Sequence, residues 1–111
     1  MKQLFEAIKA IAKENPDGFT VDLTTLKKVT GGISAAYLET QDSFGDEGLK
    51  IVIEHALKHE KTVGGWLNDE NEYFYFDSVR IFNDLEEALQ FGRENKQIAI
   101  LDLRTGKIHK L

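Results

Sequence analysis

The region from residue 63 to residue 103 constrains the fold most, because turn, strand, cap and helix signals follow one another there without a gap. Residues 62–67 and 72–77 are rich in β-branched and aromatic side chains, and the polar run 68–71 separates them. This pattern predicts two strands joined as a hairpin. The hairpin is followed directly by a helix signal, so both elements are expected in one compact unit.

A capped helix is predicted after the hairpin. Asn83 is a favourable N-cap residue, and Glu86 stands three residues later, as a capping box requires. The apolar stripe that follows has helical spacing, and the helix is expected to end near Asn95. Residues 98–103 then predict a buried strand, and a turn at 104–107 leads into a short last strand at 108–111.

The first half of the chain repeats the same order of elements. Residues 2–15 predict an amphipathic helix, which the turn chemistry of residues 15–18 ends. Strands are expected at 19–23 and, beyond a flexible glycine pair, at 33–40. Residues 45–60 predict a second helix, with acidic residues at its start, and residues 42–45 before it are expected to form a loop.

The predicted fold class is therefore α+β, with helix, strand and strand occurring three times (αββαββαββ). Hairpins favour a largely antiparallel sheet, and three amphipathic helices need an apolar sheet face to cover. The three units share no residue-level identity, so the repeat is one of pattern only. At 111 residues the chain is expected to form a single domain, 1–111.

Composition excludes several classes of function. The chain contains no cysteine, which leaves no disulfide framework and suits a reducing, cytoplasmic location. No apolar run approaches the length of a membrane span, so no membrane partner is expected. The formal net charge of -5 disfavours direct nucleic-acid binding. A protein partner with a basic surface fits this charge better.

Catalytic and cofactor motifs are weak, and we predict no catalytic, cofactor-binding or metal-binding residues. His55 and His59 have helical metal-ligand spacing and His109 is a conceivable third ligand, but so isolated a pair constrains a site poorly. Asp102 follows a strand without a partner base, so it is interpreted as structural. The glycine pairs match neither nucleotide-binding loop, and no cofactor is expected.

The aromatic residues of the hairpin have two possible roles. Strand alternation places Phe74 and Phe76 on one face and Tyr73, Tyr75 and Asp77 on the other. The tyrosine face is an aromatic surface if no helix covers it, although its acidic neighbours disfavour base stacking. The step from Gly64 to Trp66 is interpreted as a close backbone approach or a bulge, with the indole in the core. The alternative is an exposed Trp66 that anchors a partner.

Acidic residues form three clusters, before the second helix, in the hairpin turn and at the start of the third helix. Charged helix N-termini and solvated turns explain most such residues. The functional alternative is that the clusters converge into an acidic face for a basic groove. With the tyrosines, the candidate partner-binding residues are Asp42, Asp46, Glu47, Asp69, Glu70, Glu72, Tyr73, Tyr75, Asp84 and Glu87.

Two blocks of sequence carry a family resemblance: 39–49, and a C-terminal pattern comprising Gly64–Leu67, Tyr73–Asp77, Asp84–Ala88, Phe91–Arg93, Asn95, Gln97–Ile100 and Asp102–Leu103. The C-terminal pattern resembles a module of phage, plasmid and conjugative-element proteins, including very large polyvalent ones. The block at 39–49 resembles small stand-alone proteins of Bacteroides-type elements. The C-terminal half is also similar to that of some small proteins that resemble inhibitors of type II CRISPR effectors.

The resemblance implies a non-enzymatic accessory protein of a mobile genetic element that binds another protein, with a host defence nuclease as a candidate partner. In the inhibitor version, an acidic face would occupy the nuclease's basic nucleic-acid channel. The resemblance supplies no catalytic residues. Two alternatives stay open: a structural or oligomeric module that buries its tyrosine face against a second copy, and a small enzyme subunit in which Asp77 and Asp102 converge.

Overall fold

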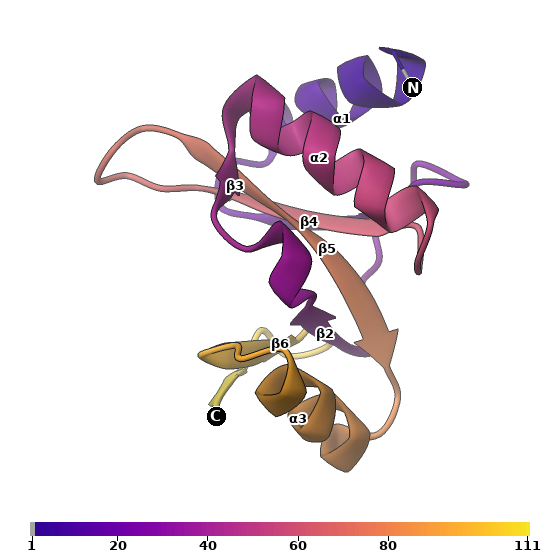
Figure 1. The fold of residues 1–111 in the computed structure, drawn as a ribbon, viewed down its shortest axis with the longest axis vertical. Coiled ribbons are helices and arrows are strands. Elements are labelled where there is room, and N and C mark those ends of the chain that lie inside the picture. The colour runs from indigo at the N-terminus through magenta and orange to yellow at the C-terminus, as the bar shows by residue number, and fades with distance from the viewer. Residues whose placement is uncertain (1) are drawn as a thin grey trace.

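The computed structural model describes residues 2–111 and has an α+β fold, with three α-helices and seven strands in the described part of the chain (Figure 1). The elements in chain order are α1 (Lys2–Glu14), β1 (Phe19–Asp22), β2 (Ile33–Ala36), the short 3-10 helix η1 (Leu38–Thr40), β3 (Ser43–Phe44), α2 (Gly45–Leu57), β4 (Thr62–Leu67), β5 (Phe74–Phe82), α3 (Leu85–Glu94), β6 (Ala99–Asp102) and β7 (Ile108–Lys110). None of these helices is long and apolar enough to cross a membrane.

The sheet is antiparallel at every strand pair and has the order β1-β4-β5-β2-β6-β7, with β3 beside β5. The expected three-fold repeat of helix, strand and strand is not found, because η1 and β3 stand between β2 and α2. The two strands of the first predicted repeat, β1 and β2, are also not neighbours in the sheet. Strand β1 pairs with β4, whereas β2 pairs with β5 and β6.

The long strand β5 organises the sheet. Its first half pairs with β4 along one edge, from Phe74 to Ser78, and its second half pairs with β2 along the other edge, from Val79 to Phe82. The sequence prediction ended this strand at Asp77. Ser78 and Arg80 are polar residues on the core side of the strand, so the apolar alternation that marks a strand is lost after that point.

Both apolar cores lie on the same face of the sheet. Helices α1 and α2 cover the first, which includes Ile8, Ile53 and Phe76, and α3 covers the second, which includes Phe82 and Ile100. In Figure 1, α1 and α2 lie over β4 and β5 while α3 lies beside β2 and β6. Alternate residues of β5 point to opposite faces. The other face, which no helix of residues 2–111 covers, therefore carries Tyr75, Asp77 and Val79.

Helix α3 begins one residue later than the sequence pattern predicted. Its N-cap is Asp84, whose carboxylate accepts a hydrogen bond of 3.0 Å from the backbone N–H of Glu87. The predicted cap at Asn83 is wrong. Because β5 extends to Phe82, Asn83 lies in the bend that separates strand from helix, and the next residue takes the extended backbone conformation of a cap.

Candidate functional site

A row of aromatic side chains crosses the helix-free face of the sheet. Trp66 of β4 and Phe44 of β3 lie opposite Tyr75 of β5, one on each side. The Trp66 and Tyr75 rings stack with centroids 5.5 Å apart, and the Phe44 and Tyr75 centroids are 5.3 Å apart. Tyr73 extends the row, with its ring 4.9 Å from that of Phe44. Three strands thus build one aromatic surface.

Three of these side chains are exposed and Tyr75 between them is half-buried, although aromatic side chains normally supply buried area. The relative exposure is 44% for Phe44, 45% for Trp66 and 52% for Tyr73. The interpretation of Trp66 as a core anchor is therefore wrong. The Phe19 ring takes the corresponding place in the core, and it approaches Gly65 so closely that a Cβ there would lie 2.7 Å from a ring carbon. The predicted close backbone approach is confirmed, at Gly65.

The hairpin turn fixes two of the tyrosines. Asn71 accepts a hydrogen bond from the backbone N–H of Tyr73 at 3.0 Å, and its amide donates to the Tyr75 hydroxyl at 2.9 Å. Asn68 accepts from the backbone N–H of Glu70 at 2.9 Å. Two asparagine side chains therefore hold the turn, as their preference for local backbone bonds predicts. Alternation placed the tyrosines on one face and left open whether a helix covers it; no helix of residues 2–111 does.

The segments that carry this aromatic row are rich in carboxylates. Residues 38–49 and 66–79, which contribute the row, contain no lysine or arginine. They contain eight acidic residues: Glu39, Asp42, Asp46, Glu47, Asp69, Glu70, Glu72 and Asp77. Two of these carboxylates face the helices instead of the row, since Glu39 contacts His55 of α2 and Asp46 pairs with Lys9 of α1 at 3.3 Å. The local charge is strongly negative, which attracts cationic groups and repels phosphates.

The three predicted acidic clusters do not converge into one face. The turn cluster of Asp69, Glu70 and Glu72 lies where β5 begins, whereas the antiparallel pairing of Ser43 with Phe76 places Asp42 near Asp77, farther along β5. Asp84, the N-cap of α3, and Glu87, in the first turn of α3, lie beyond the other end of β5. A nine-residue strand spans roughly 27 Å. The third cluster therefore belongs to the opposite end of the molecule.

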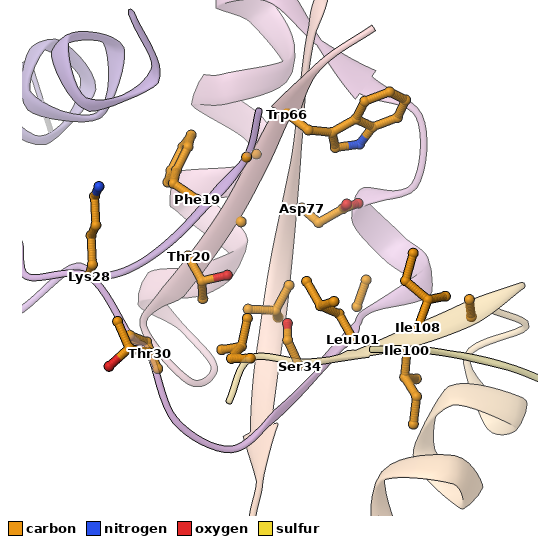
Figure 2. A pocket seen from close by; sticks show the side chains of 18 of the residues that line it. Phe19, Thr20, Lys28, Thr30, Ser34, Trp66, Asp77, Ile100, Leu101 and Ile108 are labelled. Atoms are coloured by element: carbon orange, nitrogen blue, oxygen red, sulfur yellow. The ribbon is translucent and has the colours of Figure 1, made fainter. Parts of the chain in front are cut away.

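A groove of about 610 Å³ continues from the aromatic row along the same sheet face. Its apolar floor includes Ala36, Val79, Leu101 and Ile108, and Trp66 lies at one end. In Figure 2, Leu101 and Ile108 lie on the groove side of the sheet, whereas Ile100 points toward α3. The groove is a concave apolar surface, the usual form of a binding site.

Asp77 is a carboxylate within this apolar groove (Figure 2). It lies opposite Gly64, which has no side chain to cover it. Burial raises the pKa of Asp77 to about 6, and the nearby charge of Asp42 adds to the rise. A cationic group on a partner would stabilise the ionised form of this carboxylate. Asp77 was placed on the tyrosine face by alternation, but its place in a groove was not predicted.

Asp102 lies on the opposite, helix-covered face, because it pairs with Ile33 in the core. Its carboxylate accepts hydrogen bonds from the Arg104 backbone N–H at 2.9 Å and from the guanidinium at 2.9 and 3.1 Å. These bonds lower the pKa of Asp102. Asp102 has the structural role that was predicted, and it does not converge with Asp77 as the enzyme alternative requires.

One cluster of metal-ligand side chains is present among the described residues, and it lies away from this face. Glu39, His55 and His59 each offer a ligand atom within 4.8 Å of the others. His109, the third ligand considered from sequence, lies in β7 and does not belong to the cluster. Sequence spacing identified the two histidines but not Glu39.

Phe44 is the member of the aromatic row that sequence reasoning missed. Residues 42–45 were predicted to form a loop, and a two-residue strand carries no alternation of its own. Only its pairing with β5 places the ring beside Tyr75.

Comparisons of the chain with protein-family models, with curated proteins and with solved structures find no match.

Proposed function

We propose that this chain is a non-enzymatic binding module whose helix-free sheet face holds a protein partner with a basic surface. The observation that carries the proposal is the exposed aromatic row from Trp66 to Phe44, bordered by carboxylates and by no lysine or arginine from its own segments. Exposed aromatic side chains in a fixed arrangement are typical anchors of protein interfaces.

Charge decides between the classes of partner. An aromatic row on an open sheet is also how RNA-binding modules stack bases, but those modules surround the row with lysine and arginine. Here Asp42, Glu70, Glu72 and Asp77 take those places. A cationic, partly apolar protein surface matches both the aromatic and the acidic groups, whereas a polyanion matches only the first.

The resemblance to mobile-element proteins extends this proposal to a specific class of partner. We propose a host defence nuclease, whose basic nucleic-acid channel would receive the acidic hairpin end and the aromatic row. Such a channel is rich in lysine and arginine because it holds a nucleic-acid backbone. Occupation of the channel by carboxylates would exclude the nucleic acid.

The test is binding of the purified chain to a guide-loaded type II CRISPR effector, measured by biolayer interferometry at several salt concentrations. Charge reversal of Asp69, Glu70 and Glu72 to Lys should slow association and flatten the salt dependence. Reversal of Glu86, Glu87 and Glu94 on α3 is the matched control and should change little. Trp66→Ala should weaken the complex by about 2 kcal/mol or more, as an anchor residue does.

Ile51→Ala is the control for Trp66→Ala, because Ile51 is 53% exposed on α2, away from the open face. Equal losses from the two variants would contradict the assignment of the surface. Tight binding of single-stranded RNA or DNA at physiological salt would contradict the choice of partner class. A stable homodimer that Trp66→Ala dissociates would instead support the oligomeric alternative.

A further inference from the structure

Three side chains of the types that bind metal ions lie close together on the helix-covered side of the sheet, where η1 contacts α2. Glu39 comes from η1, His55 from α2, and His59 from the turn that follows α2. His55 Nε2 is 3.0 Å from Glu39 Oε1, and the two imidazole rings stack with centroids 3.8 Å apart. The site is separate from the open face and does not depend on the proposed function.

Both histidines have Nδ1 engaged by the protein. His59 Nδ1 is 2.7 Å from the backbone carbonyl oxygen of His55, which accepts only, so Nδ1 carries the proton and Nε2 keeps its lone pair. His55 Nδ1 is 2.8 Å from the hydroxyl of Ser78, a fully buried residue. Metal-binding histidines are commonly held in this way, by a hydrogen bond at the nitrogen that does not bind the metal.

The contact between His55 and Glu39 depends on the tautomer of His55. When Nε2 carries the proton, it donates to the Glu39 carboxylate and Nδ1 accepts from the Ser78 hydroxyl. When Nδ1 instead donates to Ser78, Nε2 presents a lone pair beside that carboxylate. In this second tautomer, Nε2 and the carboxylate are two donors that face a shared position, which a divalent metal ion would fill.

The geometry is within reach of zinc coordination. Ligand distances of about 2.0 to 2.2 Å place two ligands of a tetrahedral ion roughly 3.3 to 3.5 Å apart. The three donor atoms are now 3.0 Å apart at the His55–Glu39 contact and within 4.8 Å overall. The two imidazole planes are nearly parallel, at 7°, so one ring must rotate before both lone pairs point to one ion. Glu39 and His59 are exposed, so rotation of their side chains can bring the donors to these distances.

The surroundings restrict how far these side chains move. The Tyr37 ring packs against both imidazoles, with centroid distances of 4.9 Å to His55 and 5.0 Å to His59. Arg80, whose charge is felt at Tyr37, would oppose a cation nearby, but it pairs with Glu60 at 3.7 Å. The donors are therefore held close together in a region of balanced charge.

We propose that Glu39, His55 and His59 form a surface site for a divalent transition metal ion, with zinc as the best chemical match. Two imidazoles and a carboxylate suit zinc, whereas calcium and magnesium prefer ligand sets made only of oxygen. Three protein ligands leave one coordination position for water or for a side chain of another molecule.

The experiment is isothermal titration of the untagged, EDTA-treated chain with zinc chloride, with cobalt(II) absorption as an additional readout of tetrahedral coordination. One ion per chain should bind. Glu39→Gln and His59→Ala should each weaken binding at least tenfold, because even outer-shell substitutions cost about 10- to 100-fold. Both residues are exposed, so these variants should fold, whereas loss of His55 would also remove the bond to Ser78.

His109→Ala is the matched control, because His109 is a histidine outside the cluster. It should bind zinc as the unsubstituted chain does and should retain the cobalt spectrum. The proposal is overturned if zinc binding is absent, if Glu39→Gln and His59→Ala bind as tightly as the unsubstituted chain, or if His109→Ala weakens binding as much as they do.

Discussion

Trp66 lies directly across the β4–β5 ladder from Tyr75, and the two rings stack with centroids 5.5 Å apart on the face of the sheet that carries no helix. The residue before Trp66 is Gly65, which has no side chain and leaves room in the core for the Phe19 ring. One residue of this dipeptide therefore permits close core packing, and the next supplies the exposed surface.

Trp66→Ala should cost the fold only about 1 kcal/mol, because a half-exposed indole contributes mainly its stacking on Tyr75. Phe76→Ala, one ladder position away on the core face, should cost about 3 to 5 kcal/mol. Urea denaturation followed by circular dichroism measures both, since fluorescence loses its probe in the first variant. If Trp66→Ala and Phe76→Ala lowered the free energy of unfolding equally, the indole would lie in the core.

Asp77→Asn should stabilise the protein at high pH. The folded-state pKa of Asp77, about 6, lies above the ordinary value of 3.8. The stability that the protonated Asp77 gives the folded state is therefore fully present below pH 3.8, and it is lost as the pH rises through 6. The uncharged variant avoids this loss, which is about 1 to 2 kcal/mol once solvent screening of a partly exposed group is allowed for.

Urea melts of both proteins at pH 4 and pH 8 test this prediction, because other titrating groups cancel in the difference between them. The variant should gain stability at pH 8 and little at pH 4. The same substitution should weaken the complex with a basic partner, which needs the ionised carboxylate. A gain of equal size at both pH values would show that Asp77 is not held at a raised pKa.

Asp84→Ala should destabilise the domain by about 1 kcal/mol, because it removes the cap that accepts from the Glu87 backbone N–H. Asn83→Ala should stay within about 0.5 kcal/mol of the unsubstituted protein, as an exposed residue outside the cap. Thermal or urea unfolding of the two variants side by side distinguishes them. If Asn83→Ala destabilised the protein more than Asp84→Ala, Asn83 and not Asp84 would be the N-cap.

Gly65→Ala should cost about 1 to 3 kcal/mol, because the added Cβ would lie 2.7 Å from the Phe19 ring and 3.0 Å from that of Phe76. Gly64→Ala is the matched control, since its nearest contacts would be at an ordinary 3.6 Å. Its unfolding free energy should change by less than about 1 kcal/mol. Similar costs for both glycines would mean that the core adjusts around Gly65.

Features that depend on local periodicity were predictable from the sequence. The three helices, the hairpin of β4 and β5, and the tyrosine face all follow from side-chain spacing, which reports on a single element. Phe76 and Tyr75 point to opposite faces of the sheet as soon as residues 74–77 are extended, whichever strands they pair with. The structural role of Asp102 likewise follows from its position at a turn, where Arg104 is only two residues away.

Features that depend on contacts between distant segments were visible only in the folded chain. Phe44 joins the aromatic row only through the pairing of β3 with β5, and Glu39 reaches His55 only because η1 packs against α2. Trp66 faces outward because strand register places Gly65 against Phe19. Register and packing are set by contacts across the whole sheet, and neither leaves a signal in the spacing of residues along one segment.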